Sequence, residues 1–258
     1  MGDQPRKRNG RFSHQEHTAP TPLELEHLAR EHPDLLAVLK SAAALQRSVP
    51  DAVLVGGSAA AMYAGHRDSY DHDHVLADLI ERYDAVVEAA ESTDGWATSV
   101  KASRPPMTLM GSIGGIEAGL RQLRRKVPLE TTLVTLPGGD AVTVPTLAEA
   151  LRVKAYLVVQ RNQVRDYLDV VALADRLGVQ DAATVLRHLD EYYLDRSGED
   201  DSVVTALVQR LAEPNPRDSK VTLQLDRYKG LLPRWQDWGA VTAMCDTLAR
   251  AVLQGGDL

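Results

Sequence analysis

A short apolar segment that runs directly into glycine and serine constrains the fold of this chain most strongly. Residues 52–55, Ala-Val-Leu-Val, are rich in β-branched side chains, which favour a buried strand. Gly56, Gly57 and Ser58 follow at once and open an alanine-rich helical segment. A strand that turns through glycine into a helix exposes backbone N–H groups at the amino end of the helix, where they bind anions. The segment therefore predicts a phosphate site, with the Ser58 hydroxyl as a further donor.

Two acidic residues follow on the next predicted strand, residues 70–75. Asp71 and Asp73 are one residue apart, so a strand points both carboxylates to the same face of its sheet. Paired carboxylates of this kind hold Mg²⁺ together with substrate phosphates. Glycine-serine turns and alternating aspartates are each common in structural roles. Their combination on adjacent strands predicts nucleotidyl transfer from a nucleoside triphosphate.

The combined pattern resembles that of the AbiEii-type nucleotidyltransferase toxins, which include the mycobacterial MenT proteins and belong to the polymerase β-like superfamily. In that family Gly-Gly-Ser precedes a helix of small residues and then Gly-His-Arg-x-Ser-x-Asp-x-Asp. This chain fills the fixed positions with Gly57, Ser58, Gly65, His66, Arg67, Ser69, Asp71 and Asp73. The resemblance implies catalytic, metal-binding roles for Asp71 and Asp73, and nucleotide binding by Gly57, Ser58 and Arg67.

A second part of the resemblance lies downstream, where the family has a helical lysine, an arginine and then Lys-Asp-x-x-Asp. The chain offers Lys154, Arg161 and Arg165-Asp166-Tyr167-Leu168-Asp169. We expect Lys154, Arg161 and Arg165 on one face of a single continuous helix. The resemblance implies that Lys154 contacts the triphosphate and that Asp166 supports the site. A buried lysine needs an anionic partner, which we expect to be Asp71, Asp73 or Asp166.

The surroundings of the two aspartates depart from the family pattern. A third carboxylate is expected on a later strand, and Glu130 in the predicted strand 129–136 is the candidate metal ligand. His72 and His74 alternate with the aspartates, so they point to the opposite face of the sheet. There they are either core histidines or partners of acidic groups.

The remaining pattern predicts an α+β fold, in which a small mixed sheet with flanking helices is followed by a C-terminal helical bundle. We expect helices at 33–47 and 76–91, a hairpin of strands 129–136 and 141–144, and helices from Thr146 onward. Thr146 and Glu149 form a predicted capping box. Residues 110–119 contain four glycines and are predicted to be a loop. The expected regions are a disordered basic tail (1–20), a nucleotidyltransferase core (21–145) and a helical domain (146–258).

Charge and cysteine content restrict the partners and the compartment. The formal net charge is −7, so the chain as a whole is not an electrostatic binder of nucleic acid. A local basic run either contacts a nucleic-acid backbone or forms a solvated helix face; its residues are Arg121, Arg124, Arg125 and Lys126. The single cysteine, Cys245, and the lack of an apolar run of about 20 residues predict a cytoplasmic protein without a membrane partner.

We therefore expect a Mg²⁺-dependent nucleotidyltransferase that binds a nucleoside triphosphate. By resemblance its acceptor is the 3′ end of tRNA, and the protein is the toxin of a toxin–antitoxin system with a cognate antitoxin. One alternative is transfer to a small molecule such as an aminoglycoside or lincosamide antibiotic. The other is an inactive relative that binds a nucleotide or a partner protein, which the lack of a clear third acid favours.

Overall fold

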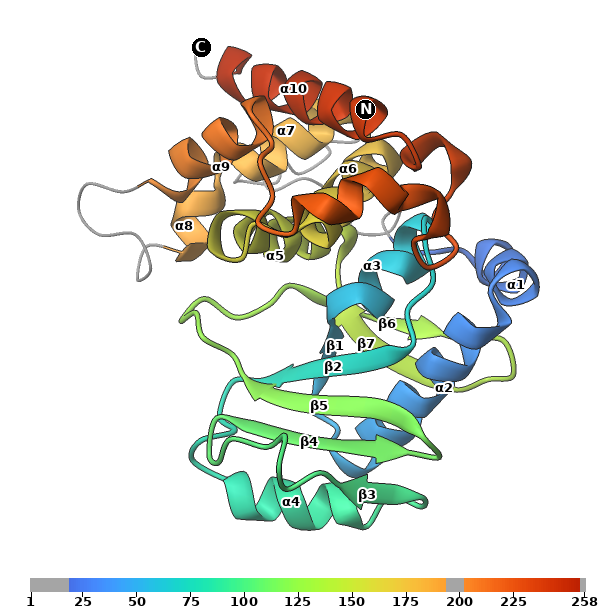
Figure 1. Ribbon diagram of the computed structural model, residues 1–258. Helices are drawn as coiled ribbons and strands as arrows, with labels where there is room; N and C mark the ends of the chain where they lie inside the picture. The colour runs from blue at the N-terminus through green and yellow to red at the C-terminus, as the bar shows by residue number, and fades with distance from the viewer. Residues whose placement is uncertain (1–18, 194–201, 256–258) are drawn as a thin grey trace, which may run out of the picture.

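A computed structural model describes residues 19–193 and 202–255 of the chain. In Figure 1 a five-stranded sheet lies below a group of helices formed by the second half of the chain. The predicted tail at residues 1–20 falls outside the described residues, apart from its last two positions. The mixed sheet with flanking helices and the C-terminal helices confirm the predicted α+β fold class.

Two helices precede the first strand, and both begin with proline. Helix α1 spans Pro22–Glu31 and α2 spans Pro33–Ser48. The Thr21 hydroxyl accepts from the Glu24 backbone N–H while the Glu24 carboxylate accepts from the Thr21 N–H, which completes a capping box. Strand β1 (Val53–Val55) then leads without a loop into α3 (Gly56–Ala64). Gly56 makes this direct transition possible because its φ is +79°.

The central sheet has the strand order β1-β2-β5-β4-β3. Its remaining strands are β2 (Asp71–Leu76), β3 (Trp96–Thr98), β4 (Thr108–Ile113) and β5 (Ile116–Gln122). Strands β2 and β5 are parallel, and the other neighbours are antiparallel. Odd-numbered residues of β2 and β5 share one face of the sheet, and even-numbered residues share the other.

The predicted loop at residues 110–119 is wrong, because these residues form most of the β4–β5 hairpin. Only Gly114 and Gly115 make the turn, with φ of +57° and +88°. Gly111 and Gly119 lie inside the strands, where other side chains approach closely. A Cβ on Gly111 would lie 2.4 Å from Cζ2 of Trp96. Glycine here reflects tertiary contact and not chain reversal.

The predicted helix at residues 76–91 is shorter than expected, since α4 spans only Tyr83–Glu91. Leu76 still belongs to β2, and its carbonyl oxygen accepts from the Leu123 N–H at 2.7 Å. The Gln122 side chain then fixes the following turn by accepting from the Ile80 N–H at 2.9 Å. Because Gln122 and Leu123 hold the chain through these hydrogen bonds, α4 begins only at Tyr83.

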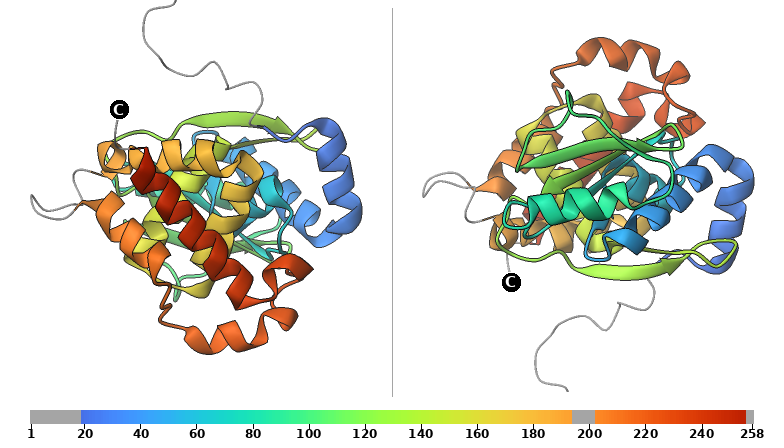
Figure 2. Two further views of the ribbon diagram at one scale, coloured as in Figure 1. Left: turned by 90° about the horizontal axis from the view of Figure 1, so that it is seen from above. Right: turned by 90° about the horizontal axis from the view of Figure 1, so that it is seen from below.

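A separate hairpin and a group of helices complete the fold. Strands β6 (Thr131–Thr135) and β7 (Ala141–Pro145) form the predicted hairpin as a two-stranded sheet. The elements that follow are α5 (Leu147–Gln160), α6 (Val164–Leu177), α7 (Val179–Arg187), α8 (Leu189–Tyr193), α9 (Val203–Ala212), the 3-10 helices η2 (Ser219–Arg227) and η3 (Pro233–Trp235), and α10 (Trp238–Gln254). Figure 2 shows α10 lying across the helices that it contacts, α6, α7 and α9. Within the described residues, no helix combines the length and the apolarity needed to cross a membrane.

The expected continuous helix through Lys154 and Arg165 is wrong, because the chain breaks between α5 and α6. Asn162 sits at the break with φ of +53°. Its side-chain amide donates to the Asn215 carbonyl oxygen at 2.7 Å, and the Val164 N–H donates to Asp218 Oδ1 at 2.8 Å. Lys154 therefore lies on α5 and Arg165 on α6.

Two apolar clusters hold these layers together. The smaller one fills the space between α2, α4 and the even-numbered face of the sheet, with Leu45, Leu76, Val86 and Leu120 among its members. The right-hand view of Figure 2 shows α2 and α4 on the same side of the sheet. The larger cluster includes residues of α1, α2, α3, the β6–β7 hairpin and the helices from α5 to α10. The odd-numbered residues of β2 and β5 belong to neither cluster, and their face of the sheet borders a cleft.

Candidate active site

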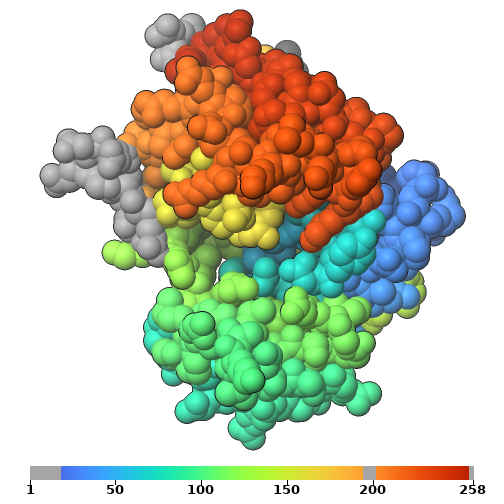
Figure 3. All heavy atoms as spheres, viewed as in Figure 1, coloured from blue at the N-terminus to red at the C-terminus, as the bar shows by residue number. Residues whose placement is uncertain are grey.

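A cleft of about 800 Å³ lies between the odd-numbered face of the sheet and the α5–α6 region. Figure 3 shows the hollow between the green sheet region and the yellow and orange helices. Its lining includes the start of α3, strands β2, β4 and β5, the segment after β5, the helices α5 and α6, Tyr193 of α8, and Tyr228 and Lys229 after η2. The two predicted motifs, which lie about 100 residues apart, thus reach one site.

Asp71 and Asp73 both line the cleft, as their alternation on β2 requires. The parallel pairing with β5 sets Asp71 opposite Glu117 and Asp73 opposite Gly119. Glu117 therefore lies on the same face as both aspartates and also lines the cleft. It is the third carboxylate of this wall. Sequence reasoning missed it, although the alternation of Glu117 with Ala118 and Leu120 was a usable signal.

The predicted third acid, Glu130, is wrong. It precedes β6, outside the central sheet, and its carboxylate contacts Arg152 Nη1 at 2.9 Å and the Tyr192 hydroxyl at 3.0 Å. Strand β6 belongs to the separate hairpin, so no residue near its start can face the aspartates through the sheet. Glu130 is also absent from the cleft lining.

The carboxylate wall has the donor chemistry that Mg²⁺ requires. Gly119 leaves room for it, because a Cβ there would lie 2.6 Å from Asp73 Oδ1. Asp73 currently bonds to Arg121, whose Nε lies 3.1 Å from the same oxygen. Among the described residues, no three metal-binding side chains are already gathered around one point. Asp71, Asp73 and Glu117 are the residues of this wall whose carboxylate oxygens could hold such an ion.

The glycine-serine turn presents its backbone and not its serine side chain to the cleft. Gly57 lines the cleft, and a Cβ there would lie 2.9 Å from Arg67 Nη2. Ser58 is fully buried. Its hydroxyl donates to the Asp71 carbonyl oxygen and lies 3.0 Å from the Ser69 hydroxyl. The hydroxyl therefore fixes the start of β2 against α3 and does not line the cleft, contrary to the expected role of the Ser58 side chain.

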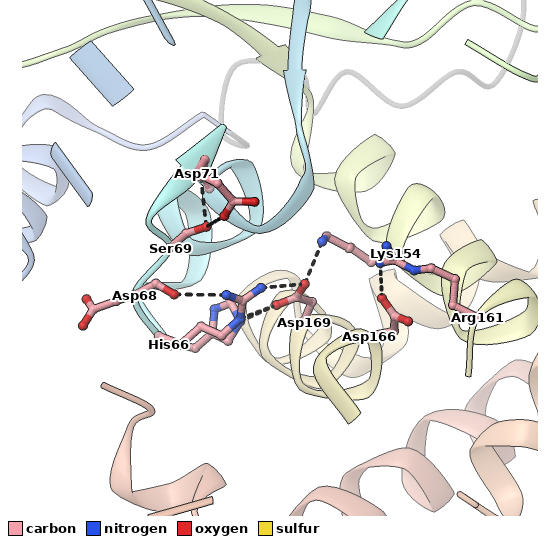
Figure 4. Close-up of polar contacts among 10 residues, drawn as sticks. His66, Asp68, Ser69, Asp71, Lys154, Arg161, Asp166 and Asp169 are labelled. Carbon is pink, nitrogen blue, oxygen red and sulfur yellow. Dashed lines mark hydrogen bonds and ion pairs between the residues drawn. The ribbon is translucent and has the colours of Figure 1, made fainter. Parts of the chain in front are cut away.

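A buried ionic group closes the other wall of the cleft (Figure 4). Asp169 on α6 is fully buried and accepts hydrogen bonds from Arg67 Nε at 2.9 Å and Nη2 at 3.1 Å. His66 Nε2 lies 2.9 Å from the same carboxylate, and Lys154 Nζ lies 2.7 Å from it. The prediction that Lys154 pairs with Asp71, Asp73 or Asp166 is therefore wrong. Its partner is Asp169. The helix break turns α6 so that Asp169 faces α5.

Asp166 lies one turn before Asp169 on α6 and is also fully buried. Its carboxylate pairs with Arg161, which lines the cleft just beyond the end of α5. Asp166 does not line the cleft itself. In this arrangement Asp166 holds an arginine at the cleft wall and does not face the cleft itself.

One carboxylate thus serves two buried cations. Burial alone would raise the pKa of Asp169, but Arg67 and Lys154 outweigh burial and hold this pKa well below its usual range. Burial lowers the pKa of Lys154, and Asp169 opposes that effect. Burial also lowers the pKa of His66, which favours its neutral form. With Arg67 and Lys154 charged, the group carries excess positive charge, which favours an anionic ligand in the cleft.

The basic run divides between the cleft and the interior. Arg121 is on β5, Arg124 and Arg125 follow it, and all three line the cleft, whereas Lys126 is exposed outside it. Arg125 is buried and lies 2.7 Å from Glu149. Neither the expected nucleic-acid contact nor the solvated helix face holds for Arg125, because it anchors its loop to α5. Glu149 is used in this pair, so only the Thr146 half of the predicted capping box forms.

Among known proteins, no protein-family model matches the chain. The chain is 39% identical over 132 residues to the mycolic acid-containing lipids exporter MmpL11 of Mycolicibacterium smegmatis, covering 51% of the chain and 13% of the exporter. It is 34% identical over 192 residues to the heme uptake protein MmpL11 of Mycobacterium tuberculosis H37Rv, covering 72% of the chain and 20% of that protein. The chain therefore spans a fifth or less of the length of these curated relatives.

In structure, the chain resembles MenT4, a nucleotidyltransferase toxin of Mycobacterium tuberculosis H37Rv. The TM-score is 0.55 at 18% sequence identity, and the match covers 93% of this chain and 91% of MenT4. The mixed sheet and its flanking helices thus form a nucleotidyltransferase fold.

Proposed function

We propose that this protein is a Mg²⁺-dependent nucleotidyltransferase that transfers a nucleoside monophosphate from a nucleoside triphosphate to a hydroxyl group of RNA. One observation carries the proposal: a single cleft sets three carboxylates opposite two buried cations. The carboxylates belong to Asp71, Asp73 and Glu117, and the cations are Arg67 and Lys154. This is the charge arrangement that a metal-bound triphosphate needs.

Each wall of the cleft has a defined part in the reaction. The backbone at Gly57 and the buried cations Arg67 and Lys154 bind the triphosphate. Asp71, Asp73 and Glu117 hold Mg²⁺, which when bound neutralises phosphate charge and activates the acceptor hydroxyl. The acceptor oxygen forms a bond to the α-phosphorus, the bond from that phosphorus to the bridging oxygen breaks, and pyrophosphate leaves. A carboxylate of the same wall accepts the proton of the hydroxyl.

The charge of the cleft favours RNA over an antibiotic acceptor. Eight basic residues line the cleft against three acidic ones. The buried carboxylates of Glu149, Asp166 and Asp169 pair with some of these basic residues, which leaves an excess of two positive charges, although the whole chain carries a net charge of −7. A cleft enriched in positive charge attracts a polyanion and repels a cationic aminoglycoside. Glu117 supplies a third carboxylate on the metal wall, which weakens the alternative of an inactive relative.

We further propose that the acceptor is the 3′ end of tRNA, and that the protein acts in the cytoplasm as a toxin with a cognate antitoxin. The sequence motifs and the likeness to the MenT4 fold support this proposal. The MmpL11 matches are named for export or heme uptake, but they share only a limited part of their length with this chain. We propose that the shared part has this fold and not the transport activity.

The test is incubation of the purified protein with Mg²⁺, total RNA and each labelled nucleoside triphosphate in turn. We expect label in RNA of tRNA size with at least one nucleotide. The label should be absent with a chelator or with Asp71→Ala. Label in an aminoglycoside or lincosamide and in no RNA would replace the proposal with the antibiotic alternative. Label in neither would contradict transferase activity.

A further inference from the structure

The turn after η2 is attached to the first sequence motif, although it lies about 160 residues further along the chain. The Asp68 N–H donates to the Lys229 carbonyl oxygen at 2.7 Å, and the Leu232 N–H donates to the His66 carbonyl oxygen at 2.8 Å. His32 Nδ1 lies 2.7 Å from Asp68 Oδ1 and so holds the aspartate in place. These contacts fix the turn Tyr228–Gly230 at the rim of the cleft.

The backbone of this turn is strained at a lysine. Lys229 has φ of +43°, a conformation that residues with a side chain rarely adopt. Gly230 follows with φ of +62°, and a Cβ there would lie 2.4 Å from Asp68 Oδ2. Packing thus accounts for the glycine. The lysine side chain is exposed and lies beside the Tyr70 ring, so burial does not account for its backbone conformation. Strain that persists at a residue with an exposed side chain points to use of that side chain.

The Lys229 side chain lies where a ligand of the cleft can reach it. Lys229 and its neighbour Tyr228 both line the cleft. The Lys229 ammonium lies 5.8 Å from the centre of the Tyr70 ring, and it forms no ion pair with any residue in 19–193 or 202–255. Lys154 and Arg67, by contrast, are both buried against Asp169. Lys229 is therefore an accessible, unneutralised cation at the rim.

We propose that Lys229, held by the turn Tyr228–Gly230, binds a backbone phosphate of the acceptor nucleic acid. This inference rests on the proposed function. The buried cations Arg67 and Lys154 form the inner anion site, which suits the triphosphate. Lys229 is exposed and comes from a separate segment, so it meets a ligand that extends out of the cleft. An ammonium on a flexible stem binds phosphate as a point charge and needs no fixed geometry.

The experiment measures binding of a fluorescently labelled, short single-stranded RNA by anisotropy at several salt concentrations. The variants are Lys229→Asn and Lys229→Gly, which tolerate the backbone conformation, and Lys229→Arg, which keeps the charge. Lys220→Asn is the matched control, because this exposed lysine in η2 does not line the cleft. Calorimetry with a non-hydrolysable nucleoside triphosphate and Mg²⁺ separates the nucleotide from the acceptor.

We expect Lys229→Asn and Lys229→Gly to weaken RNA binding about 5- to 20-fold at 0.1 M salt. The slope of log K against log salt should fall by about 0.7, the value for one phosphate contact on a single strand. Lys229→Arg should restore both quantities, and Lys220→Asn should leave them unchanged. Nucleotide affinity should stay within about twofold. The melting temperature should not fall, because both substitutions relieve the positive-φ strain.

Three results would overturn the inference. RNA binding by Lys229→Asn at the wild-type level would remove the contact. Loss of nucleotide affinity alone would assign Lys229 to the triphosphate. Lower melting temperatures in Lys229→Asn and Lys229→Gly without rescue by Lys229→Arg would make the lysine structural. A wild-type protein that binds nucleotide and RNA leaves the proposed function standing in each case, whereas a wild-type protein that binds neither defeats both.

Discussion

Lys154 is the residue whose surroundings say most about the ligand. Its ammonium is buried and shares the Asp169 carboxylate with Arg67 and His66, so its charge is only partly compensated. We expect Lys154→Met to lower nucleotide affinity by about 1.5–3 kcal/mol, the contribution of a charge-assisted contact. The fold should survive because Arg67 still neutralises Asp169. Calorimetric titration with nucleotide measures the change, and unchanged affinity would make Lys154 a purely structural partner of Asp169.

Gly119 has no side chain, and this leaves space at the carboxylate wall formed by Asp71, Asp73 and Glu117. A Cβ at this position would lie 2.6 Å from Asp73 Oδ1, closer than the two atoms can pack. We expect Gly119→Ala to displace the Asp73 carboxylate and weaken Mn²⁺ binding, followed by electron paramagnetic resonance, about tenfold or more. Asp71→Ala should have a similar effect while the thermal stability stays near wild type. Wild-type Mn²⁺ affinity in both variants would place the metal elsewhere.

Arg121 is expected to weaken metal binding, so its removal should have the opposite effect to Gly119→Ala. Its Nε bonds to the same Asp73 oxygen, so it competes with a cation for that ligand. We expect Arg121→Gln to tighten Mn²⁺ binding severalfold, since the pair is partly exposed and its attraction is screened by solvent. Arg165→Gln removes an equal charge from the cleft lining without a contact to Asp73, and it is the control. An equal gain in both variants would reveal a general charge effect.

Strand β2 is the element in which the two faces have opposite chemistry. His72 and His74 face the core between the sheet and α2, where His72 Nε2 lies 3.0 Å from the Ser41 hydroxyl. Burial lowers the pKa of His72 to about 4 and the pKa of His74 well below its usual value. Both rings are therefore neutral in the folded protein but titrate near pH 6.5 when unfolded.

This difference predicts loss of stability in acid. The stabilisation is complete above about pH 6.5 and is lost as the pH falls, because the unfolded chain binds protons that the folded chain excludes. At pH 4, the difference between the folded and unfolded pKa of His72 alone should lower the free energy of unfolding by about 3 kcal/mol. Urea unfolding at pH 7.5 and pH 5 measures the loss, which His74→Leu should reduce and the exposed His27→Gln should not. A pH dependence that His74→Leu leaves intact would contradict this origin.

Elements set by local pattern could be predicted, whereas those set by distant contacts could not. The strand before Gly56 and the alternation of Asp71 and Asp73 are visible in neighbouring residues. The helix break at Asn162 depends on Asn215 and Asp218, more than 50 residues away. The glycines inside β4 and β5 led to the prediction of a loop. They are glycines because Trp96 and Asp73 approach them closely, and neither residue is adjacent in the sequence.

The same distinction applies to the candidate site. The cleft could be placed on the first motif from the sequence, because a strand fixes the direction of its alternate side chains. The alternation around Glu117 was visible in the sequence, but its place beside Asp71 depends on the pairing of β5 with β2. The contact between Asp169 and Lys154 depends on the turn of α6 against α5. The Ser58 hydroxyl was expected at the phosphate site as a further donor of the glycine-serine turn. One step along the helix from Gly57 turns a side chain by about 100 degrees, and the hydroxyl bonds to the Asp71 carbonyl oxygen instead.

At the scale of the whole molecule, one apolar cluster joins both halves of the chain. It includes Leu39 of α2, Tyr63 of α3, Leu151 of α5 and Leu248 of α10. The division at residues 145 and 146 stays a prediction about organisation, but the two regions share this core. We therefore expect one cooperative thermal transition, with equal calorimetric and van't Hoff enthalpies. Two separate transitions would show that the regions unfold independently.

The cleft is assembled from segments spread along most of the chain, and this has a consequence for protein synthesis. The carboxylates of β2 and β5 leave the ribosome first, Lys154 and Asp169 follow, and Lys229 emerges after them. Domains generally form from the amino end as translation proceeds. A chain that ends before α6 therefore has Arg67 but lacks Asp169, the carboxylate that holds Arg67 and Lys154 together at the cleft. Under the proposed function, transfer activity can begin only after the helices α5 and α6 have been made and packed against the sheet.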